Sequence, residues 1–304
     1  MGQSKMFSDE ELPKGIQRVV GLPSDALGAL WHSIVVDEDI KSRLLSHAVL
    51  NFTVRGKVPR SVIPLHGILM LTGSPGTGKT SLARGLAHCV AESFPSQKFC
   101  LLEVEPHSLV SAAHGKTQRA VTDLFTQSIA EAASANHTIV LLDEVETLAV
   151  SRAKLSMDAN PIDIHRATDA VLVQLDLLAE KHSNLLFIAT SNFSQAIDEA
   201  FLSRCDLILE VPLPNLDACE HILKDCLIGF SKAYSDIGNL ARDPKIKDCA
   251  RACEGLDGRA IRKVVANALA TDIRTAINPR QVTMEMLIAA ANMAHKKRVA
   301  GDGK

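Results

Sequence analysis

The stretch GILMLTGSPGTGKTSLARGLA, residues 67–87, decides the fold. Its centre, GSPGTGKT at residues 73–80, matches the phosphate-binding pattern G-x-x-x-x-G-K-[ST] in full. An apolar run precedes the loop and a helical pattern follows it, which is the context that this motif requires. Glycines let backbone N–H groups wrap phosphates, and the helix amino terminus adds its positive dipole. The pattern predicts a nucleotide triphosphate site in which Lys79 contacts the β- and γ-phosphates and Thr80 holds Mg²⁺.

A second motif, IVLLDE, stands at residues 139–144. Its four apolar residues predict a buried strand, and Asp143 follows at the carboxyl end, where nucleotide sites of such sheets lie. We therefore expect Asp143 to bind Mg²⁺ directly or through water. Glu144 is expected to orient and polarise the water that attacks the γ-phosphate. A glycine-rich turn that matched the loop pattern by chance would not bring this second motif with it.

Three further polar residues are candidates for contacts with phosphate. Asn192 ends the stretch ATSN, and its amide is expected to hydrogen-bond the γ-phosphate or the attacking water, although many asparagines after a strand are turn residues. Arg204 precedes the last apolar run; such an arginine is usually solvated, but NTP hydrolysis gains from an arginine that a neighbour supplies. Arg259 opens a helical pattern after Gly258 and is placed to reach a phosphate.

Apolar runs alternate with helical patterns through the first two thirds of the chain. This order predicts βαβ units and an α/β fold, with a five-stranded, mainly parallel sheet between helices. Beyond residue 213 only helical patterns remain. The chain is therefore divided into an N-terminal arm, a large α/β domain and a small all-helical domain, over residues 1–29, 30–213 and 214–304. The expected strands are residues 67–72, 100–105, 138–142, 185–190 and 207–211.

Composition excludes several classes of protein. Among 304 residues, 46% are hydrophobic and 22% are charged, which rules out disorder over most of the length. No apolar run approaches the roughly 20 residues of a membrane helix, and the first residues lack the apolar core of a signal peptide. A net charge of -2, one Trp and one Tyr argue against direct nucleic-acid binding. Seven cysteines without CxxC or metal-finger spacing fit reduced thiols, so we expect a cytoplasmic protein.

In their order along the chain, these motifs resemble those of the AAA+ ATPases. The set comprises the phosphate loop, LLDE, TSN, an arginine after a short helix, and G-x-x-G-R in a helical lid. More narrowly, the sequence resembles the pachytene-checkpoint type, which remodels HORMA-domain proteins. This narrower resemblance is carried by LWHSIVVDEDIKSRLLSHA (30–48), LLDEVETLAVSRA (141–153) and GLDGRAIRK (255–263). It implies an AAA+ P-loop domain followed by a small helical lid domain.

The resemblance also implies a homo-hexameric ring with ATP and Mg²⁺ bound between subunits. Catalysis is assigned to Glu144, Asn192 and Arg204, of which Arg204 reaches the γ-phosphate bound by the neighbouring subunit. Thr80 and Asp143 are the implied metal ligands. Loops over residues 110–116 and 153–165 are implied to face the central pore. The implied nucleotide-binding residues are Val35, Val36, Gly73, Ser74, Pro75, Gly76, Thr77, Gly78, Lys79, Thr80, Ser81, Asp143 and Arg259.

Two departures from the eukaryotic members bear on function. Ala113 and His114 stand where those proteins carry bulky aromatic residues, so His114 and Lys116 either grip a substrate by polar contacts or are merely exposed loop residues. Only some thirty residues precede the core, as in bacterial members that act on HORMA proteins in anti-phage systems with cGAS-like nucleotidyltransferases. The expected function is an ATP-hydrolysing remodeller that dissociates a HORMA complex and down-regulates such a nucleotidyltransferase.

Three alternatives belong to other functional classes. An AAA+ factor that acts on a DNA-linked complex would show salt-dependent retention on DNA, and the near-neutral charge counts against it. A membrane-bound or protease-coupled unfoldase is disfavoured because neither HExxH nor a transmembrane segment occurs. A nucleotide-gated scaffold without turnover is disfavoured by Glu144.

Overall fold

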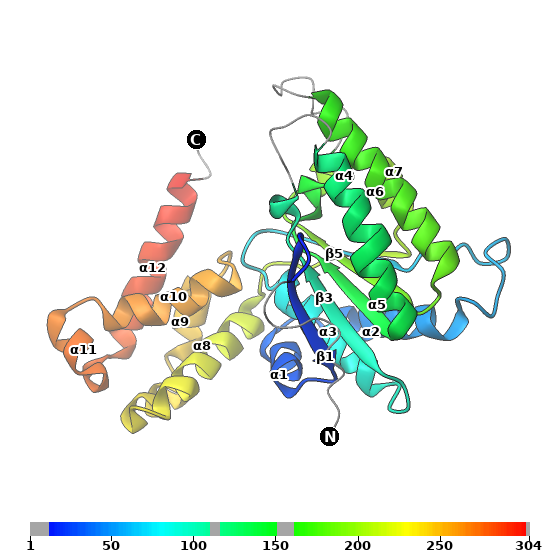
Figure 1. Ribbon diagram of the computed structural model, residues 1–304. Helices are drawn as coiled ribbons and strands as arrows, with labels where there is room; N and C mark the ends of the chain where they lie inside the picture. The colour runs from blue at the N-terminus through cyan, green and yellow to red at the C-terminus, as the bar shows by residue number, and fades with distance from the viewer. Residues whose placement is uncertain (1–11, 110–115, 151–160, 302–304) are drawn as a thin grey trace. The chain divides into compact units, whose positions relative to one another are not determined.

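A computed structural model describes residues 12–109, 116–150 and 161–301 of the chain. Its contacts form two compact units, an α/β unit built on a sheet and a helical unit (Figure 1). The α/β unit comprises Met1–Ile34, Glu38–Gly73 and Lys79–Glu210. The helical unit comprises Val35–Asp37, Ser74–Gly78 and Val211–Lys304.

The α/β unit contains a six-stranded sheet in the order β1-β3-β4-β5-β2-β6. Every neighbouring pair is parallel except β1 and β3, which are antiparallel. Strands β2, β3 and β5 are buried along their whole length, as parallel strands are when helices cover both faces of a sheet. The strands are β1 (Ile16–Leu22), β2 (Ile68–Thr72), β3 (Phe99–Val104), β4 (His137–Leu142), β5 (Leu185–Ser191) and β6 (Leu207–Glu210).

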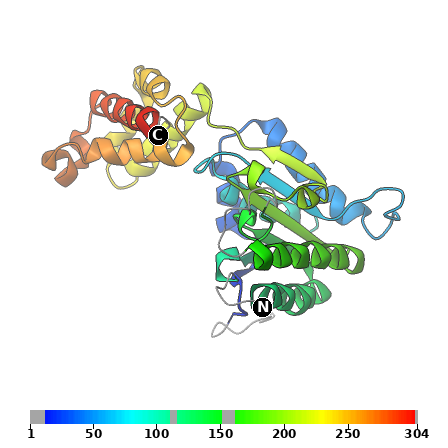
Figure 2. The same cartoon turned by 90° about the horizontal axis from the view of Figure 1, so that it is seen from above.

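Helices cover the two faces of this sheet (Figure 2). Because side chains alternate along a strand, Ile68 and Met70 of β2 join the apolar cluster on one face, together with residues of α4, α5 and α6. The other face packs against α2 and α3. The helices of this unit are α1 (Asp25–Ser33), α2 (Glu38–Val54), α3 (Lys79–Glu92), α4 (Lys116–Asp123), a π-helical turn (Leu124–Ile129), α5 (Ala130–Ala135), α6 (Pro161–Lys181) and α7 (Glu199–Leu202).

The helical unit surrounds its own apolar cluster, in which Leu223, Leu227 and Leu287 are fully buried. Three of its helices begin at residues whose carboxylate or amide oxygen caps the first turn: Asn215 before α8, Asp257 before α10 and Asp272 before α11. The helices are α8 (Leu216–Ser231), α9 (Ile246–Ala252), α10 (Gly258–Leu269), α11 (Ile273–Ile277) and α12 (Met284–Gly301). Across the described ranges of both units, no helix is long and apolar enough to cross a membrane.

All five expected strands are present. The expected number of strands is wrong, because a sixth strand lies within residues 1–29, which were expected to be an N-terminal arm. Ile16–Leu22 forms β1, a sixth strand at the edge of the sheet, and α1 follows it. Only the first and last residues of β1 are buried, so its sequence lacks the continuous apolar run of the inner strands. Pairing with β3 defines this strand, and Arg18 lies 3.8 Å from the buried carboxylate of Glu103. Tertiary pairing, rather than local sequence preference, makes the segment a strand.

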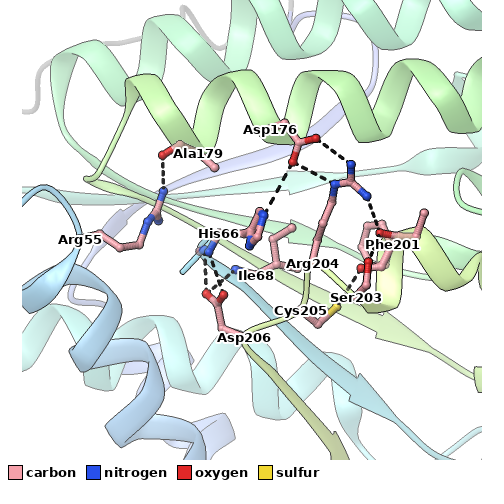
Figure 3. A network of polar contacts seen from close by, with 12 residues as sticks. Arg55, His66, Ile68, Asp176, Ala179, Phe201, Ser203, Arg204, Cys205 and Asp206 are labelled. Carbon is pink, nitrogen blue, oxygen red and sulfur yellow. Dashed lines mark hydrogen bonds and ion pairs between the residues drawn. The ribbon is translucent and has the colours of Figure 1, made fainter. Parts of the chain in front are cut away.

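Arg55, just after α2, joins the start of β5 to the end of α6 within the α/β unit. Its Nη1 donates to the carbonyl oxygen of Leu185 at 2.5 Å, and its Nη2 donates to that of His182 at 3.2 Å. Nη2 also donates to the carbonyl oxygen of Ala179 at 3.1 Å (Figure 3). Burial lowers the pKa of Arg55 to about 10, so the guanidinium stays charged at neutral pH. The side chain therefore satisfies three backbone acceptors at the end of α6 and the start of β5.

Arg55→Met is expected to lower the free energy of unfolding by about 3 kcal/mol, because the three carbonyl groups lose a charged donor. Urea denaturation followed by far-UV circular dichroism measures the change. Lys57→Met is the matched control: Lys57 is exposed in the same segment, and its loss is expected to stay within about 0.5 kcal/mol. Equal effects of the two substitutions would contradict this role of Arg55.

Candidate nucleotide site

The predicted phosphate loop lies between the carboxyl end of β2 and the start of α3. Gly73, Gly76 and Gly78 have φ angles of 141°, 81° and 95°, which side-chain-bearing residues rarely adopt. Lys79 is the first residue of α3 and only 5% exposed, and its Nζ donates to the carbonyl oxygen of Gly73 at 2.9 Å. The lysine side chain therefore folds back onto the loop in which it is predicted to contact the β- and γ-phosphates.

The remaining residues of the motif occupy the same turn. Ser74 and Pro75 are exposed, and Thr77 is buried with its hydroxyl donating to the carbonyl oxygen of Ser74 at 2.9 Å. Ser81 is half-buried in the first turn of α3. The sequence from Gly73 to Ser81 therefore folds as the strand–loop–helix that its pattern predicts.

Asp143 and Thr80 meet at the carboxyl edge of the sheet. Thr80 Oγ1 donates to Asp143 Oδ1 at 2.9 Å, and Thr190 Oγ1 at the end of β5 donates to the same oxygen. The two predicted metal ligands are therefore adjacent, and a second hydroxyl orients the carboxylate. Hydroxyl and carboxylate oxygens are the donors that Mg²⁺ prefers, so these residues fit the ion. Thr190 is absent from the sequence prediction, although it lies two residues before Asn192.

Glu144 has the left-handed conformation that is uncommon outside glycine, with φ at 53°. Its backbone N–H donates to Thr190 Oγ1 at 3.2 Å, which supports the turn after β4. Its carboxylate lies between two side chains: Asn192 Nδ2 is 3.3 Å from Oε1, and His107 Nε2 is 3.0 Å from Oε2. Local strain at a residue that the structure holds from several sides is a feature of functional sites.

The structure thus brings together Glu144, predicted to act on the attacking water, and Asn192, predicted to contact either that water or the γ-phosphate. It also adds two residues that the sequence prediction misses. His107 follows β3, the neighbour of β4, so its proximity to Glu144 follows from the strand order. Glu146 accepts from the backbone N–H of Asn192 at 3.1 Å through Oε1, and thereby holds the segment after β5 against the turn after β4.

Arg204 lies near the amino-terminal ends of the parallel strands, whereas the phosphate loop follows the carboxyl end of β2. It precedes β6, which runs parallel to β2 with Leu207 opposite Leu69. Gly73 follows the carboxyl end of β2, four residues after Leu69, so at about 3.3 Å per residue about 13 Å of chain separates the levels of Leu207 and Gly73. Arg204 is therefore held away from the Lys79 and Thr80 side chains of its own chain. It instead forms a bidentate ion pair with Asp176 on α6, at 2.9 and 2.7 Å.

Several of the predicted nucleotide-binding residues fall within the helical unit. Val35 packs against the apolar cluster of this unit, and Val36 is half-buried beside it in the chain. Arg259 has an exposed side chain, and its backbone N–H donates to the carbonyl oxygen of Gly76 at 3.3 Å. The predicted pore loops lie mostly outside the described residues, which omit 110–115 and 151–160.

A cavity of about 350 Å³ opens elsewhere in the α/β unit and contains none of the predicted site residues. Arg55, Arg60 and Glu180 contribute to its lining. Three N–H groups of the Arg55 guanidinium are bonded to backbone carbonyl groups, which gives this arginine a structural role beside the cavity. The candidate site is therefore the carboxyl end of the strands, where Thr80, Asp143 and Glu144 lie.

Comparison with known proteins agrees with this geometry. Residues 69–213 match the model of the ATPase family associated with various cellular activities (AAA). The chain is 65% identical over 294 residues to CD-NTase-associated protein 6 of Pseudomonas aeruginosa, and the match covers 97% of each chain. It is 34% identical over 278 residues to a pachytene checkpoint protein 2 homolog of Oryza sativa subsp. indica, covering 80% of this chain and 58% of that protein.

Two solved structures share the fold. The structure of C. elegans PCH-2 matches with a TM-score of 0.76 and 25% identity, over 97% of this chain and 78% of that one. A chain in the E. coli MS115-1 HORMA:CdnC:Trip13 complex matches with a TM-score of 0.71 and 19% identity, over 91% of this chain and 94% of that one. With the phosphate loop, the acidic strand end and these relatives in agreement, the chain belongs to the AAA ATPases, in the family of CD-NTase-associated protein 6 and the pachytene checkpoint protein 2 homologs.

Proposed function

We propose that this AAA ATPase binds ATP with Mg²⁺ and hydrolyses it with Glu144 as the residue that activates water. The observation that carries the proposal is the placement of the Glu144 carboxylate beside Asn192, one residue after the Thr80–Asp143 pair. Lys79 and the loop amides bind phosphate oxygens, and Glu144 and Asn192 orient the attacking water. Thr80 and Asp143 are the residues that would hold Mg²⁺. When bound, the ion neutralises charge that develops on the phosphate oxygens.

We further propose that hydrolysis is coupled to the remodelling of a HORMA-domain protein. The chain shares 65% of its residues with a protein named as CD-NTase-associated, and a chain of the same fold occurs in a HORMA:CdnC:Trip13 complex. The resemblance to the pachytene-checkpoint type points to the same substrate class. Dissociation of a HORMA protein from a cGAS-like nucleotidyltransferase would then restrain that enzyme in an anti-phage system.

The working form is proposed to be a homo-hexamer in which Arg204 completes the site of the neighbouring subunit. The support is the position of Arg204 at the edge of the sheet opposite the side chains of Lys79 and Thr80. A guanidinium at that edge serves hydrolysis only if another chain presents its nucleotide there. Arg259 in the helical unit and the segment containing Val35 and Val36 are proposed to contact the nucleotide of their own subunit.

Coupling is tested at His114 and at Lys116, the first residue of α4, which belong to the segment that the family resemblance implies to face the pore. The double substitution His114→Ala and Lys116→Ala is expected to leave basal ATPase activity within about twofold. Release of the nucleotidyltransferase from its HORMA partner should fall at least about tenfold, because force on a substrate requires a contact that moves with the ring. Gel filtration of the preformed complex after addition of ATP measures release.

The matched control is His295→Ala with Lys297→Ala, which removes the same two side-chain types at the same spacing from the exposed end of α12. This control should leave both activities unchanged. Release of the nucleotidyltransferase at the wild-type rate by the loop variant would contradict a gripping role of His114 and Lys116.

A further inference from the structure

Asp176 and Arg204 form a two-point ion pair within the α/β unit. Arg204 Nε donates to Asp176 Oδ1 at 2.9 Å, and Nη2 donates to Oδ2 at 2.7 Å (Figure 3). The Arg204 Nη1 donates to the carbonyl oxygen of Ala200 at 2.6 Å. A guanidinium carries five N–H groups, so two remain without a partner among the described residues. The bidentate geometry fixes both the rotamer and the plane of the guanidinium.

The backbone on both sides of this pair is itself anchored. Asp206, two residues after Arg204, accepts from the backbone N–H groups of His66, Gly67 and Ile68 at 2.8, 2.7 and 3.2 Å. This fan of bonds ties the start of β6 to the start of β2. On the other side, Leu175 next to Asp176 is 1% exposed and belongs to the main apolar cluster. The ion pair therefore joins two segments that packing holds in place.

Charge favours persistence of the pair at neutral pH. The hydrogen bonds from Arg204 lower the pKa of Asp176, and those to Asp176 raise the pKa of Arg204. Arg60 also favours the ionised carboxylate, and the His66 ring, whose own pKa is lowered by burial, lies 3.9 Å from Asp176. Asp176 stays deprotonated above its ordinary titration range, so the contact is lost only as the pH falls through its lowered pKa.

Two exposed apolar side chains lie near Asp176 on α6. Val173 is 55% exposed and Leu177 is 53% exposed, although both are large aliphatic residues. They lie three residues before and one residue after Asp176, and helical geometry puts residues 173, 176 and 177 on one side of α6. A second copy of this chain that presented its nucleotide to Arg204 would cover this stripe and remove water from the ion pair.

We infer that Asp176 is a positioning residue for hydrolysis in the neighbouring subunit: it holds the Arg204 guanidinium with two N–H groups directed away from the pair and available to phosphate. This inference rests on the proposed trans role of Arg204. A free arginine has many rotamers, and ordering it beforehand removes an entropy cost from the transition state. Asp176 itself touches neither substrate nor metal.

Asp176→Ala is expected to lower kcat for ATP hydrolysis about 10- to 100-fold with little change in KM, because a misplaced catalytic group costs rate more than ground-state binding. Glu180→Ala is the matched control. Glu180 is an exposed acid one turn further along α6, and its removal should change kcat less than about twofold. Thermal melting establishes that both variants are folded, and Asp176→Asn is used instead if the alanine variant is not.

A double-mutant cycle separates positioning from a structural defect. In an Arg204→Ala background, the change Asp176→Ala should have no further effect on kcat, since no guanidinium remains to be held. Rings that mix Asp176→Ala with Glu144→Gln subunits should regain activity, because some interfaces then combine an intact Glu144 with an intact Asp176–Arg204 pair. A structural role of Asp176 in its own subunit predicts additive losses and no recovery.

A readout independent of turnover is the Arg204 Nε–H signal in ¹⁵N NMR spectra of the protein without nucleotide. Its exchange with solvent should be slowed in the wild type and accelerated at least about tenfold in Asp176→Asn. Normal kcat for Asp176→Ala alongside an impaired Arg204→Ala overturns this inference alone. Normal kcat for Arg204→Ala overturns the proposed trans role. A raised kcat for Asp176→Ala would show that the ion pair restrains Arg204, which also overturns positioning.

Discussion

Glu144→Gln should lower kcat for ATP hydrolysis by about 10²–10⁴-fold, the contribution typical of a positioned proton acceptor. The amide keeps the shape of the side chain and an oxygen that accepts from Asn192 Nδ2. It cannot draw a proton from the attacking water. ATP affinity should therefore stay within about threefold of the wild type, and the variant should accumulate with nucleotide and substrate bound. Release of inorganic phosphate and equilibrium binding of ATP measure the two quantities.

Two comparison variants sharpen this test. Glu105→Gln changes an exposed carboxylate two residues before His107, and hydrolysis should stay within about twofold of the wild type. Lys79→Ala should instead weaken ATP binding at least about tenfold, because it removes a charge placed to contact phosphate. If Glu144→Gln turns over ATP at nearly the wild-type rate, the assignment of the water-activating residue is wrong.

Arg204→Ala should lower kcat by about 10³–10⁵-fold, the effect typical of an arginine supplied by a neighbouring chain to phosphoryl transfer. Binding of ATP should change little, because Arg204 lies at the opposite edge of the sheet from Lys79 and Thr80 in its own chain. Steady-state phosphate release and ATP titration again separate turnover from binding. Arg251→Ala, which removes an exposed arginine from α9, is expected to be nearly silent.

Mixed assemblies test whether Arg204 acts between chains. Neither Arg204→Ala nor Glu144→Gln is expected to be active alone. A mixed ring of the two would contain some interfaces with an intact Glu144 on one side and an intact Arg204 on the other. Activity should recover over a range of mixing ratios, and mass spectrometry of differently tagged subunits verifies exchange. Absence of recovery in verified mixed rings would count against action in trans.

The phosphate loop can be predicted from consecutive residues of the sequence. GSPGTGKT requires glycine at positive φ and an adjacent lysine and threonine, and each of these needs is met by neighbours in the chain. The inner strands are likewise predictable, because strands buried on both faces have continuous apolar sequences. Strand β1 is not, since only two of its seven residues are buried and its pairing with β3 is what makes it a strand.

The residues that contact Glu144 could not be predicted from the sequence around it. His107 lies 37 residues before Glu144, and Thr190 and Asn192 lie more than 40 residues after it. Only the strand order β3-β4-β5 brings the three strand ends together. A sequence contains the residue types of such a cluster, whereas contact among them depends on which strands are neighbours.

The sequence by itself therefore determined the AAA fold and predicts the nucleotide chemistry, because the phosphate loop and the strand that ends in Asp143 and Glu144 are written in consecutive residues. The tertiary structure decided how each predicted catalytic side chain is held. Thr190 orients Asp143, His107 contacts Glu144, and Asp176 pairs with Arg204 across 28 residues of chain. These contacts join elements that are remote in sequence, and parallel strands place such elements side by side only after the whole sheet has formed.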